Sequence, residues 1–372
     1  MTIILYLLVA ALFIAKYSPR VGLSPLPLIA AYIVAIVALY LLLRSKRVTN
    51  RLTEQVSKIT LYSLLALMVA AIGFLLWKIN PLDIRVDRWS ATTYFLQALF
   101  NDIYPYGVHT HVSETNFPSP FPMWHYLMLP FFMLGDVGLH LIVVLIIAVV
   151  AIHRYTDSYR YTLICLLLLA LSPAYWWEVA VRSDGLSNML LTFCLIMYID
   201  KRKINFDNSF TLLVIVCAIV ATTRLSAVIP MAVYLFPKYL KTSWQKMLLA
   251  PLMIMLLIFI VFMPYIFWDT DTWIFFSRNP LMSQSYKHSI WMLLTFIVIA
   301  ILISLWYKTF RQYTIALSWF LFVFMGLSSL YAYYQLDAQT PMLDSAAIDI
   351  SYQTLSLPFA IYAMTCHPSP SK

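Results

Sequence analysis

Long apolar runs separated by short polar segments recur along the whole of this chain, and they restrict its fold more than any other feature. One of them, TLYSLLALMVAAIGFLLW at residues 60–77, holds no charged side chain. The hydrocarbon core of a bilayer is about 30 Å thick, and about 20 apolar residues of helix cross it. Backbone exposed to lipid must form its hydrogen bonds within its own segment. The pattern therefore predicts helices that cross a membrane.

The composition agrees with a membrane protein. Of the 372 residues, 62% are hydrophobic and 11% are charged, whereas soluble domains have about 45–50% apolar and about 25% charged residues. A membrane barrel would instead show short segments of alternating polarity. We therefore predict an all-α fold, a polytopic transmembrane helix bundle that forms a single domain over residues 1–372, with no soluble domain. About twelve spans are expected, at residues 2–16, 25–43, 59–77, 137–153, 160–176, 185–200, 209–223, 225–238, 247–268, 289–306, 312–331 and 352–366.

The charge distribution predicts the orientation of these spans. The net charge is +9, yet the lysines and arginines lie mainly in short loops between apolar runs, as in the cytoplasmic loops of membrane proteins. This placement argues against a nucleic-acid partner. With residues 44–58 in the cytoplasm, both termini are cytoplasmic and most carboxylates lie on the outer face. The cysteines have neither disulfide nor metal spacing and are interpreted as packing residues: Cys165, Cys194, Cys217 and Cys366.

The first long outer segment, residues 78–136, has internal order. Residues 87–102 carry apolar side chains at helical spacing, which predicts an amphipathic helix on the membrane surface. Four prolines follow within residues 105–122 and exclude regular structure there. Residues 123–136 are too short to cross the membrane and return, and Pro130 interrupts them. We predict a second interfacial helix in this stretch.

Asp87, in the charged stretch INPLDIRVDRWS at residues 79–90, is the first candidate for chemistry. A carboxylate on the outer surface can act as a general base toward an acceptor hydroxyl. The alternative is structural, because Asp87 occupies the N-cap position of the predicted 88–102 helix. A capping carboxylate accepts backbone N–H bonds, which lower its pKa and weaken it as a base. Asp83 is a weaker second candidate.

Cationic side chains form a second group of candidates on the outer face. Arginine suits phosphate because its planar guanidinium binds two oxygens at once, although any one of these residues could simply anchor the chain at lipid phosphates. Arg224 stands out because it lies between two spans with almost no loop around it, and charge within a membrane is usually functional. Asp184 follows Arg182 at the start of a span, where Ser183 or Asp184 could instead cap the helix. The outer set is Arg85, Arg88, Arg182, Arg224, Arg278 and Lys287.

Metal binding has only weak support in the sequence. His109, His111 and Glu114 have the spacing H-x-H-x-x-E, but a solvated loop explains them better. The acidic DTD at residues 269–271 is similar to the metal-holding motif of nucleotide-sugar transferases. Nucleotide sugars lie on the other side of the membrane. We expect no cofactor, and a divalent metal is possible but not favoured.

The order of motifs resembles the GT-C superfamily of integral-membrane glycosyltransferases. An acidic residue follows an early span, and after it come YPY (104–106), SPFPMWHYLMLPFFMLGD (119–136) and SPAYWWEVAVRSDGLSNMLL (172–191). The nearest likeness is to bacterial polyprenyl-phosphate-mannose-dependent mannosyltransferases, and it is firmest over residues 59–200. The expected spans at 2–16, 25–43 and 59–77 all precede the catalytic loop here, whereas a single span precedes it in the family. SPFP replaces tandem prolines, and no soluble C-terminal domain follows.

The resemblance implies a catalytic role for Asp87 and a turn at Pro105–Tyr106. It also implies that Arg182 and Asp184 form a polar pair of the second outer loop. The expected substrate-binding residues are Arg88, Tyr106, Arg182, Asp184, Arg224 and Arg278. The implied reaction moves a sugar, such as mannose, from a polyprenyl phosphate to a glycan or glycolipid acceptor, with inversion. The implied site is the outer face of a bacterial inner membrane, with membrane lipids as the surrounding partners.

Two other function classes fit a chain of this kind. A transporter or flippase of lipid-linked saccharides would carry polar residues at mid-membrane and broken spans in matching positions of two halves. A polysaccharide polymerase or ligase would have its main outer loop late in the chain, whereas the longest here is early. A non-catalytic relative that keeps the scaffold is a third possibility.

Overall fold

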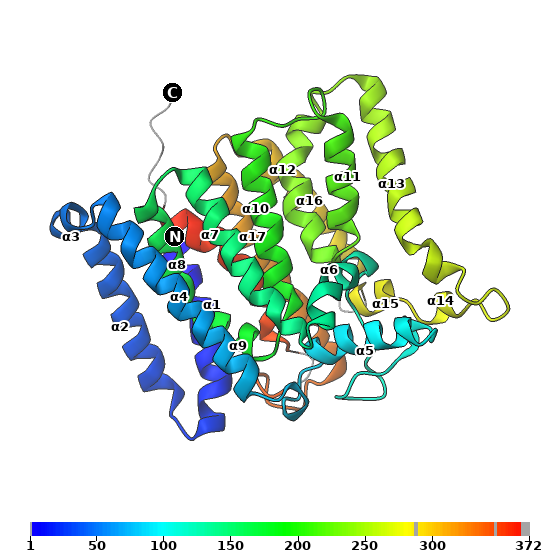
Figure 1. The fold of residues 1–372 in the computed structure, drawn as a ribbon, viewed down its shortest axis with the longest axis horizontal. Coiled ribbons are helices and arrows are strands. Elements are labelled where there is room, and N and C mark those ends of the chain that lie inside the picture. Colours follow the sequence, from blue (N-terminus) through cyan, green and yellow to red (C-terminus); the bar gives the residue numbers. More distant parts are fainter. Residues whose placement is uncertain (1, 286–288, 346–347, 366–372) are drawn as a thin grey trace. The chain divides into compact units, whose positions relative to one another are not determined.

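The computed structural model describes residues 2–285, 289–345 and 348–365, and every regular element in these ranges is a helix (Figure 1). Lys287 and Cys366, named above as candidates for anchoring and packing, lie outside the described residues. The predicted all-α fold is confirmed for the described part of the chain.

Six of the described helical segments are long and apolar enough to cross a membrane, by length and composition. This supports a helical membrane bundle. The total of twelve spans stays a prediction, since α11, α12 and α16 are apolar but shorter. The six segments are α1 with η1 (Thr2–Val21), α2 (Pro25–Arg44), α4 (Glu54–Lys78), η4 with α7 (Val137–Thr156), α13 (Trp244–Ile266) and α17 (Phe310–Leu336).

Two predicted spans differ in detail from the observed helices. The span expected at 160–176 is split into α8 (Tyr159–Ala170) and α9 (Pro173–Ala180), which are bent by 67°. Pro173 explains the break, because a proline disfavours helical backbone at the residue before it. The span expected at 352–366 contains a 3-10 helix, η5 (Ile350–Ser356), and then α18 (Leu357–Thr365). At 1.5 Å per residue, the nine residues of α18 extend only about 14 Å.

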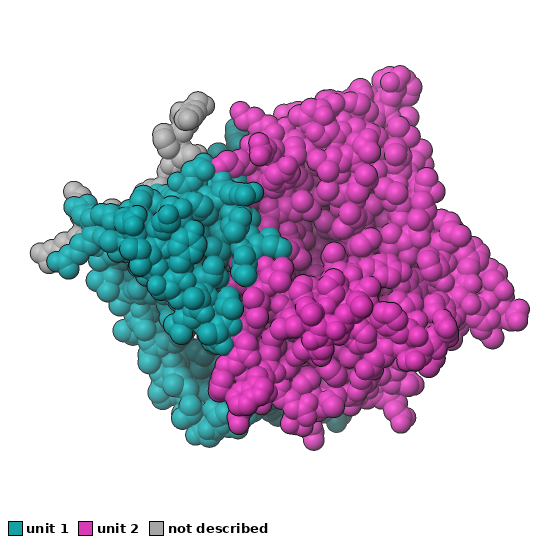
Figure 2. All heavy atoms as spheres, viewed as in Figure 1, with its two compact units in different colours: residues 1–71, 146–178, 308–372 teal, residues 72–145, 179–307 magenta. Residues whose placement is uncertain are grey.

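The helices form two compact units, which Figure 2 colours separately. Unit 1 comprises residues 1–71, 146–178 and 308–372, and unit 2 comprises residues 72–145 and 179–307. Each unit is therefore assembled from segments that are far apart in the sequence.

Unit 1 is built around α1 (Thr2–Tyr17), which packs against α2, α17 and α18. Polar contacts join it to distant segments. Tyr6 donates a hydrogen bond of 2.8 Å from its hydroxyl to the carbonyl of Leu168, and Lys16 Nζ donates one of 2.7 Å to the carbonyl of Ile348. The other elements with residues in this unit are η1 (Ser18–Val21), α3 (Lys46–Arg51), α8, η5, and parts of α4, α7 (His140–Thr156) and α9.

Unit 2 contains the first long outer segment and the helices from α10 to α16. α10 (Asp184–Lys201) and α16 (Ile290–Trp306) both pack against α12 (Leu225–Tyr239), and α11 (Phe210–Ala221) packs against α12 and α13 (Figure 1). An aromatic core that includes Phe95, Tyr106, Trp124 and Tyr265 joins α13 to the outer segment. The smaller elements are η2 (Pro81–Asp83), η3 (Pro105–Gly107), η4 (Val137–Leu139), α14 (Ile274–Ser277) and α15 (Pro280–Ser285).

Both helices predicted in the outer segment are present. They are α5 (Arg88–Phe100) and α6 (Pro122–Met133), and they pack against each other. The expected interruption at Pro130 is wrong, because α6 continues through this residue. A proline inside a helix removes one backbone donor, but the chain on its C-terminal side can stay helical. That α5 and α6 lie at a membrane surface stays a prediction.

Candidate active site

Asp87 lies at the N-cap position of α5, as the sequence indicates, but its carboxylate does not cap the helix. Its backbone carbonyl accepts the first helical hydrogen bond, from Ala91 N at 2.7 Å. The side chain is half-buried, and its Oδ2 accepts one long hydrogen bond of 3.4 Å from Asn116 Nδ2. The capping interpretation is therefore wrong for the carboxylate, which remains available to accept a proton.

The loop that supplies Asn116 is tied to the start of α5 by His111. Its Nε2 lies 3.0 Å from the carbonyl oxygen of Ile84, and its Nδ1 lies 2.6 Å from Ser90 Oγ. Both ring nitrogens thus have partners within the chain. No group of three or more metal-ligating side chains occurs in the residues that the structure describes. The contacts of His111 assign it a structural role beside Asp87.

Asp184 and Arg224 form a buried ion pair, with side chains that are each 4% exposed. Ser183 caps α10 through a 3.2 Å hydrogen bond from Gly185 N, so Asp184 is the first residue inside the helix. Arg224 precedes α12 and donates from Nε to Asp184 Oδ2. Arg88 also exerts its positive charge on this carboxylate. Two arginines, Arg88 and Arg224, therefore act on this one carboxylate.

Part of this ion pair has no partner among the described residues. Asp184 Oδ1 is buried and accepts no hydrogen bond there, and the two terminal nitrogens of Arg224 donate none. Unpaired polar atoms in a buried position are unfavourable and call for an explanation such as a ligand. The pair can therefore offer donors and one acceptor to a bound group.

Arg278 and Tyr106 are placed differently from each other. Arg278 is exposed, and its guanidinium carbon lies 3.9 Å from the ring centre of Phe117. Phe117 follows Asn116 in the sequence, the residue that donates a hydrogen bond to Asp87. Tyr106 is 1% exposed and donates its hydroxyl to the carbonyl of Pro120 at 3.1 Å. Burial raises the pKa of Tyr106 well above its usual value. The geometry supports a packing role for Tyr106, while Arg278 remains accessible to a ligand.

The guanidinium group of Arg182 is occupied by hydrogen bonds to other residues of the protein. Its Nε donates to both oxygens of Asp136, at 2.9 and 3.2 Å, and its Nη2 donates to the carbonyls of Leu76 and Ile79 at 2.8 and 3.0 Å. The residue is 3% exposed. Its φ of 53° lies in the left-handed region that few non-glycine residues adopt. These contacts leave Arg182 little capacity for a ligand.

Gly138 allows Leu76 and Arg182 to pack closely against the backbone. A Cβ at this position would lie 2.7 Å from Leu76 Cδ2 and 2.8 Å from Arg182 Cγ. We expect Gly138→Ala to lower the free energy of unfolding by about 1–3 kcal/mol, because the added methyl displaces two packed side chains. Thermal unfolding of the purified protein in detergent measures this. Gly73→Ala, where nothing lies within 4 Å, is the control, and equal effects of the two changes would contradict the expectation.

The DTD motif forms a turn. Asp269 Oδ1 accepts hydrogen bonds from the backbone N–H groups of Asp271 and Thr272, at 3.0 and 3.3 Å. Bonds from the Thr272 side chain and from these N–H groups hold the pKa of Asp269 below its usual value. A carboxylate used in this way supports a structural role for the motif.

His125 and Asn188 were not candidates in the sequence, yet both are buried close to the ion pair. His125 is 0% exposed, stacks on Phe95 with ring centres 3.6 Å apart, and lies 3.1 Å through Nε2 from the carbonyl oxygen of Pro120. Asn188 is one helical turn after Asp184 on α10. The four-residue spacing of Asp184 and Asn188 could have identified Asn188 from the sequence, because it places both side chains on one face of the helix.

The buried His125 should make the stability of the fold sensitive to acid. Burial lowers its pKa to about 3 from an ordinary value of 6.5. The unfolded chain therefore binds a proton that the folded chain excludes, so the contribution of His125 is complete above pH 6.5 and decreases as the pH falls toward 3. We expect a loss of up to about 1.4 kcal/mol per pH unit below this point, measured by unfolding temperatures between pH 7.5 and 5.

A matched pair of variants tests the assignment to His125. His125→Gln retains an N–H donor for Pro120 but does not titrate, so its stability should fall less steeply with acid. His109→Gln, at an exposed position, should keep the native slope. If His125→Gln and the native protein lose stability in parallel, another group is responsible.

Comparison of the chain with models of known protein families, with curated proteins and with solved structures gives no match.

Proposed function

We propose that this protein is a membrane glycosyltransferase that moves a sugar from a polyprenyl-phosphate donor to a glycan or glycolipid acceptor. One observation carries the proposal: the half-buried carboxylate of Asp87 is not used to cap α5. A carboxylate that accepts only one long hydrogen bond keeps the lone pairs that a general base needs. The motif order that resembles the GT-C superfamily adds support.

In the proposed reaction, Asp87 takes the proton from the acceptor hydroxyl. The acceptor oxygen forms a bond to the anomeric carbon, and the bond from this carbon to the phosphate oxygen breaks on the opposite face. The configuration is therefore inverted, and polyprenyl phosphate leaves with the electron pair. Arg224 and Arg278 stabilise the negative charge that builds on the phosphate. This reaction requires neither a nucleotide pocket nor an obligatory metal.

The cationic surroundings support a phosphate ligand. Arg88 and Arg224 both act on the single carboxylate of Asp184, and the terminal nitrogens of Arg224 are unpaired among the described residues. Phosphate is a suitable ligand because arginine donates to two of its oxygens in parallel. Asp184 Oδ1 would accept a hydroxyl of the substrate, since it is buried without a partner in the described chain.

The proposal includes an orientation. We place the chain in a bacterial inner membrane with both termini cytoplasmic, about twelve crossings, and α5 and α6 lying at the outer surface. The basic loop at residues 44–58 supports the cytoplasmic assignment of that side.

The rival with an observation in its favour is a transporter or flippase of lipid-linked saccharides. Helices α8 and α9 form a broken apolar pair, bent by 67°, and broken helices mark the substrate sites of many transporters. A transporter of this kind would need a matching break in a second half, and among the described residues the α8–α9 pair is the one apolar pair with such a bend.

A single preparation distinguishes the two functions. Membranes containing the protein receive radiolabelled polyprenyl-phosphate mannose and a glycolipid acceptor, and both transfer of label and its movement across the bilayer are measured. We expect label in the acceptor without net translocation of the donor. Translocation without transfer would favour the transporter, and an unconsumed donor with no movement would contradict both.

A further inference from the structure

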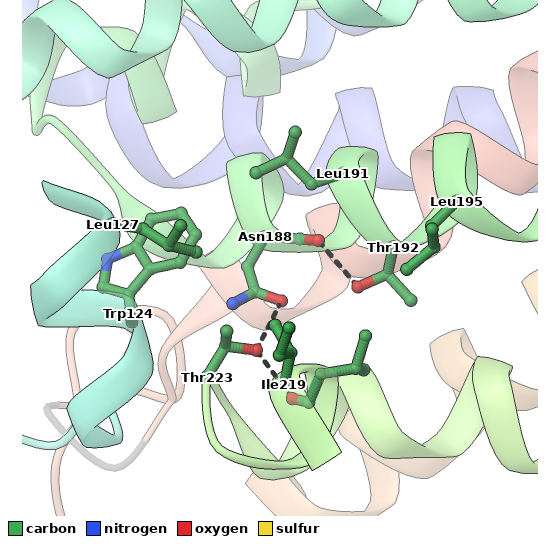
Figure 3. Close-up of a pocket in the computed structure, with 9 residues that line it drawn as sticks. Trp124, Leu127, Asn188, Leu191, Thr192, Leu195, Ile219 and Thr223 are labelled. Carbon is green, nitrogen blue, oxygen red and sulfur yellow. Dashed lines mark hydrogen bonds between the residues drawn. The ribbon is translucent and has the colours of Figure 1, made fainter. Parts of the chain in front are cut away.

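A small cavity lies between α6, α10 and α11 within unit 2 (Figure 3). Its volume is about 100 Å³, whereas pockets that hold whole small molecules measure about 300–1,000 Å³. The cavity therefore accommodates only part of a ligand. Its lining is Trp124, Leu127, Asn188, Leu191, Thr192, Leu195, Ile219, Val220 and Thr223.

Asn188 supplies an unused donor in this lining. The residue is 4% exposed, and its Oδ1 lies 3.4 Å from Thr223 Oγ1, a hydroxyl that donates its proton to the carbonyl of Val220 at 2.7 Å. Its Nδ2 is buried and has no partner among the described residues. Figure 3 shows this nitrogen directed into the space between Trp124 and Thr223. A buried amide N–H without an acceptor is unfavourable, so the site is complete when a ligand brings an oxygen to Asn188.

The remaining lining restricts the chemistry of that ligand. No charged side chain contributes to it, which argues against a phosphate or a carboxylate inside the cavity. Leu127 and Ile219 are 42% and 38% exposed, so the cavity has an accessible rim that is itself apolar. The occupant must combine a neutral oxygen acceptor with a hydrocarbon chain. An isoprenoid chain has no such oxygen, whereas the acyl ester of a glycerolipid has a carbonyl at the start of its chain.

We propose that this cavity binds the ester carbonyl and first methylenes of a glycerolipid acyl chain, with Asn188 Nδ2 as the donor to the carbonyl oxygen. Leu191 and Leu195 follow Asn188 along the same side of α10 and contact the chain. This assignment does not depend on the proposed transferase function, because a transporter could hold a lipid in the same way.

Paired lipids test the hydrogen bond. The purified full-length chain in detergent is titrated with diester and with diether phosphatidylglycerol of equal chain length, and binding is measured by native mass spectrometry. Headgroup contacts are the same for both lipids, but only the diester has carbonyls. We expect the diester to bind about tenfold more tightly. Equal binding of the two lipids to the native protein overturns the proposal.

Two variants locate the effect. Asn188→Leu removes the donor at similar volume and should abolish the preference for the diester. Thr192→Val is the control, because the Thr192 hydroxyl donates to the backbone carbonyl of Asn188 at 2.9 Å and not to the ligand. The preference should persist in Thr192→Val. A preference that survives in Asn188→Leu overturns the assignment.

A measurement on the native chain covers the case in which Asn188→Leu does not fold. A diester lipid with a photoreactive diazirine near its carbonyl is crosslinked to the protein, and the labelled peptides are sequenced. We expect label at residues 124–127, 191–195 and 219–223, which line the cavity. Label confined to other helices overturns the proposal.

Discussion

Asp87→Asn is expected to reduce sugar transfer by about 10²–10⁴-fold, the range that a positioned general base contributes. Asparagine has nearly the same shape as aspartate but cannot take the proton of the acceptor hydroxyl. Membranes containing the variant would be assayed with radiolabelled polyprenyl-phosphate mannose and a glycolipid acceptor. Undiminished transfer in Asp87→Asn would rule out the proposed mechanism.

Asp83→Asn is the matched control, four residues away. Asp83 is exposed, and its Oδ1 accepts a 3.3 Å hydrogen bond from Asn80 Nδ2, so its replacement should leave transfer near the native rate. Asp87→Ala provides a second test, of stability. Replacing an aspartate that caps a helix by alanine lowers the free energy of unfolding by about 1 kcal/mol. Because the Asp87 side chain does not cap α5, Asp87→Ala should lower it by about 0.5 kcal/mol or less.

Arg182→Met is expected to cause the largest loss of stability, about 3–5 kcal/mol of unfolding free energy. The change leaves the Asp136 carboxylate, 26% exposed, without its cation. It also removes the donor from two backbone carbonyls, those of Leu76 and Ile79. The measurement is thermal unfolding in detergent, followed by binding of the donor lipid to the fraction that remains folded.

The two measurements separate a structural role from a ligand-binding role. Arg85→Met, at an exposed arginine, should change stability by about 0.5 kcal/mol or less. If Arg182→Met keeps the native unfolding temperature but loses affinity for the donor, then Arg182 is a substrate ligand, as the motif resemblance implies. Loss of stability with retained affinity would instead establish it as a structural clamp.

Local features of the sequence predicted much of the fold. Asp87 followed by regularly spaced apolar residues predicted α5 to within a few residues. The apolar runs predicted the long helices, because a chain that exposes such runs has few other ways to satisfy its backbone. The segment 352–366 differs in helix type, because apolar content alone does not fix it: buried polar residues such as Gln353 and Thr354 belong to a 3-10 helix that precedes α18.

Side-chain pairing was not predictable in the same way. Arg182 and Asp184 are two residues apart, and the sequence suggested that they form one polar pair. In the structure, Arg182 pairs with Asp136 and Asp184 pairs with Arg224. The left-handed backbone at Arg182 turns the chain just before α10 begins. Such partners depend on tertiary packing between distant segments, which no local spacing encodes.

The division of the chain into units has a consequence for its synthesis. Unit 2 is complete once residue 307 has been made, whereas unit 1 also requires residues 308–365. The hydrogen bond from Lys16 to Ile348 joins residues that are 332 positions apart. Chains grow from the N-terminus, and a contact forms only when both of its partners have been made. Because α1 also packs against α18, its packing is completed only after α18 has been synthesised. During that interval, the face of α1 that α18 later covers lacks its partner.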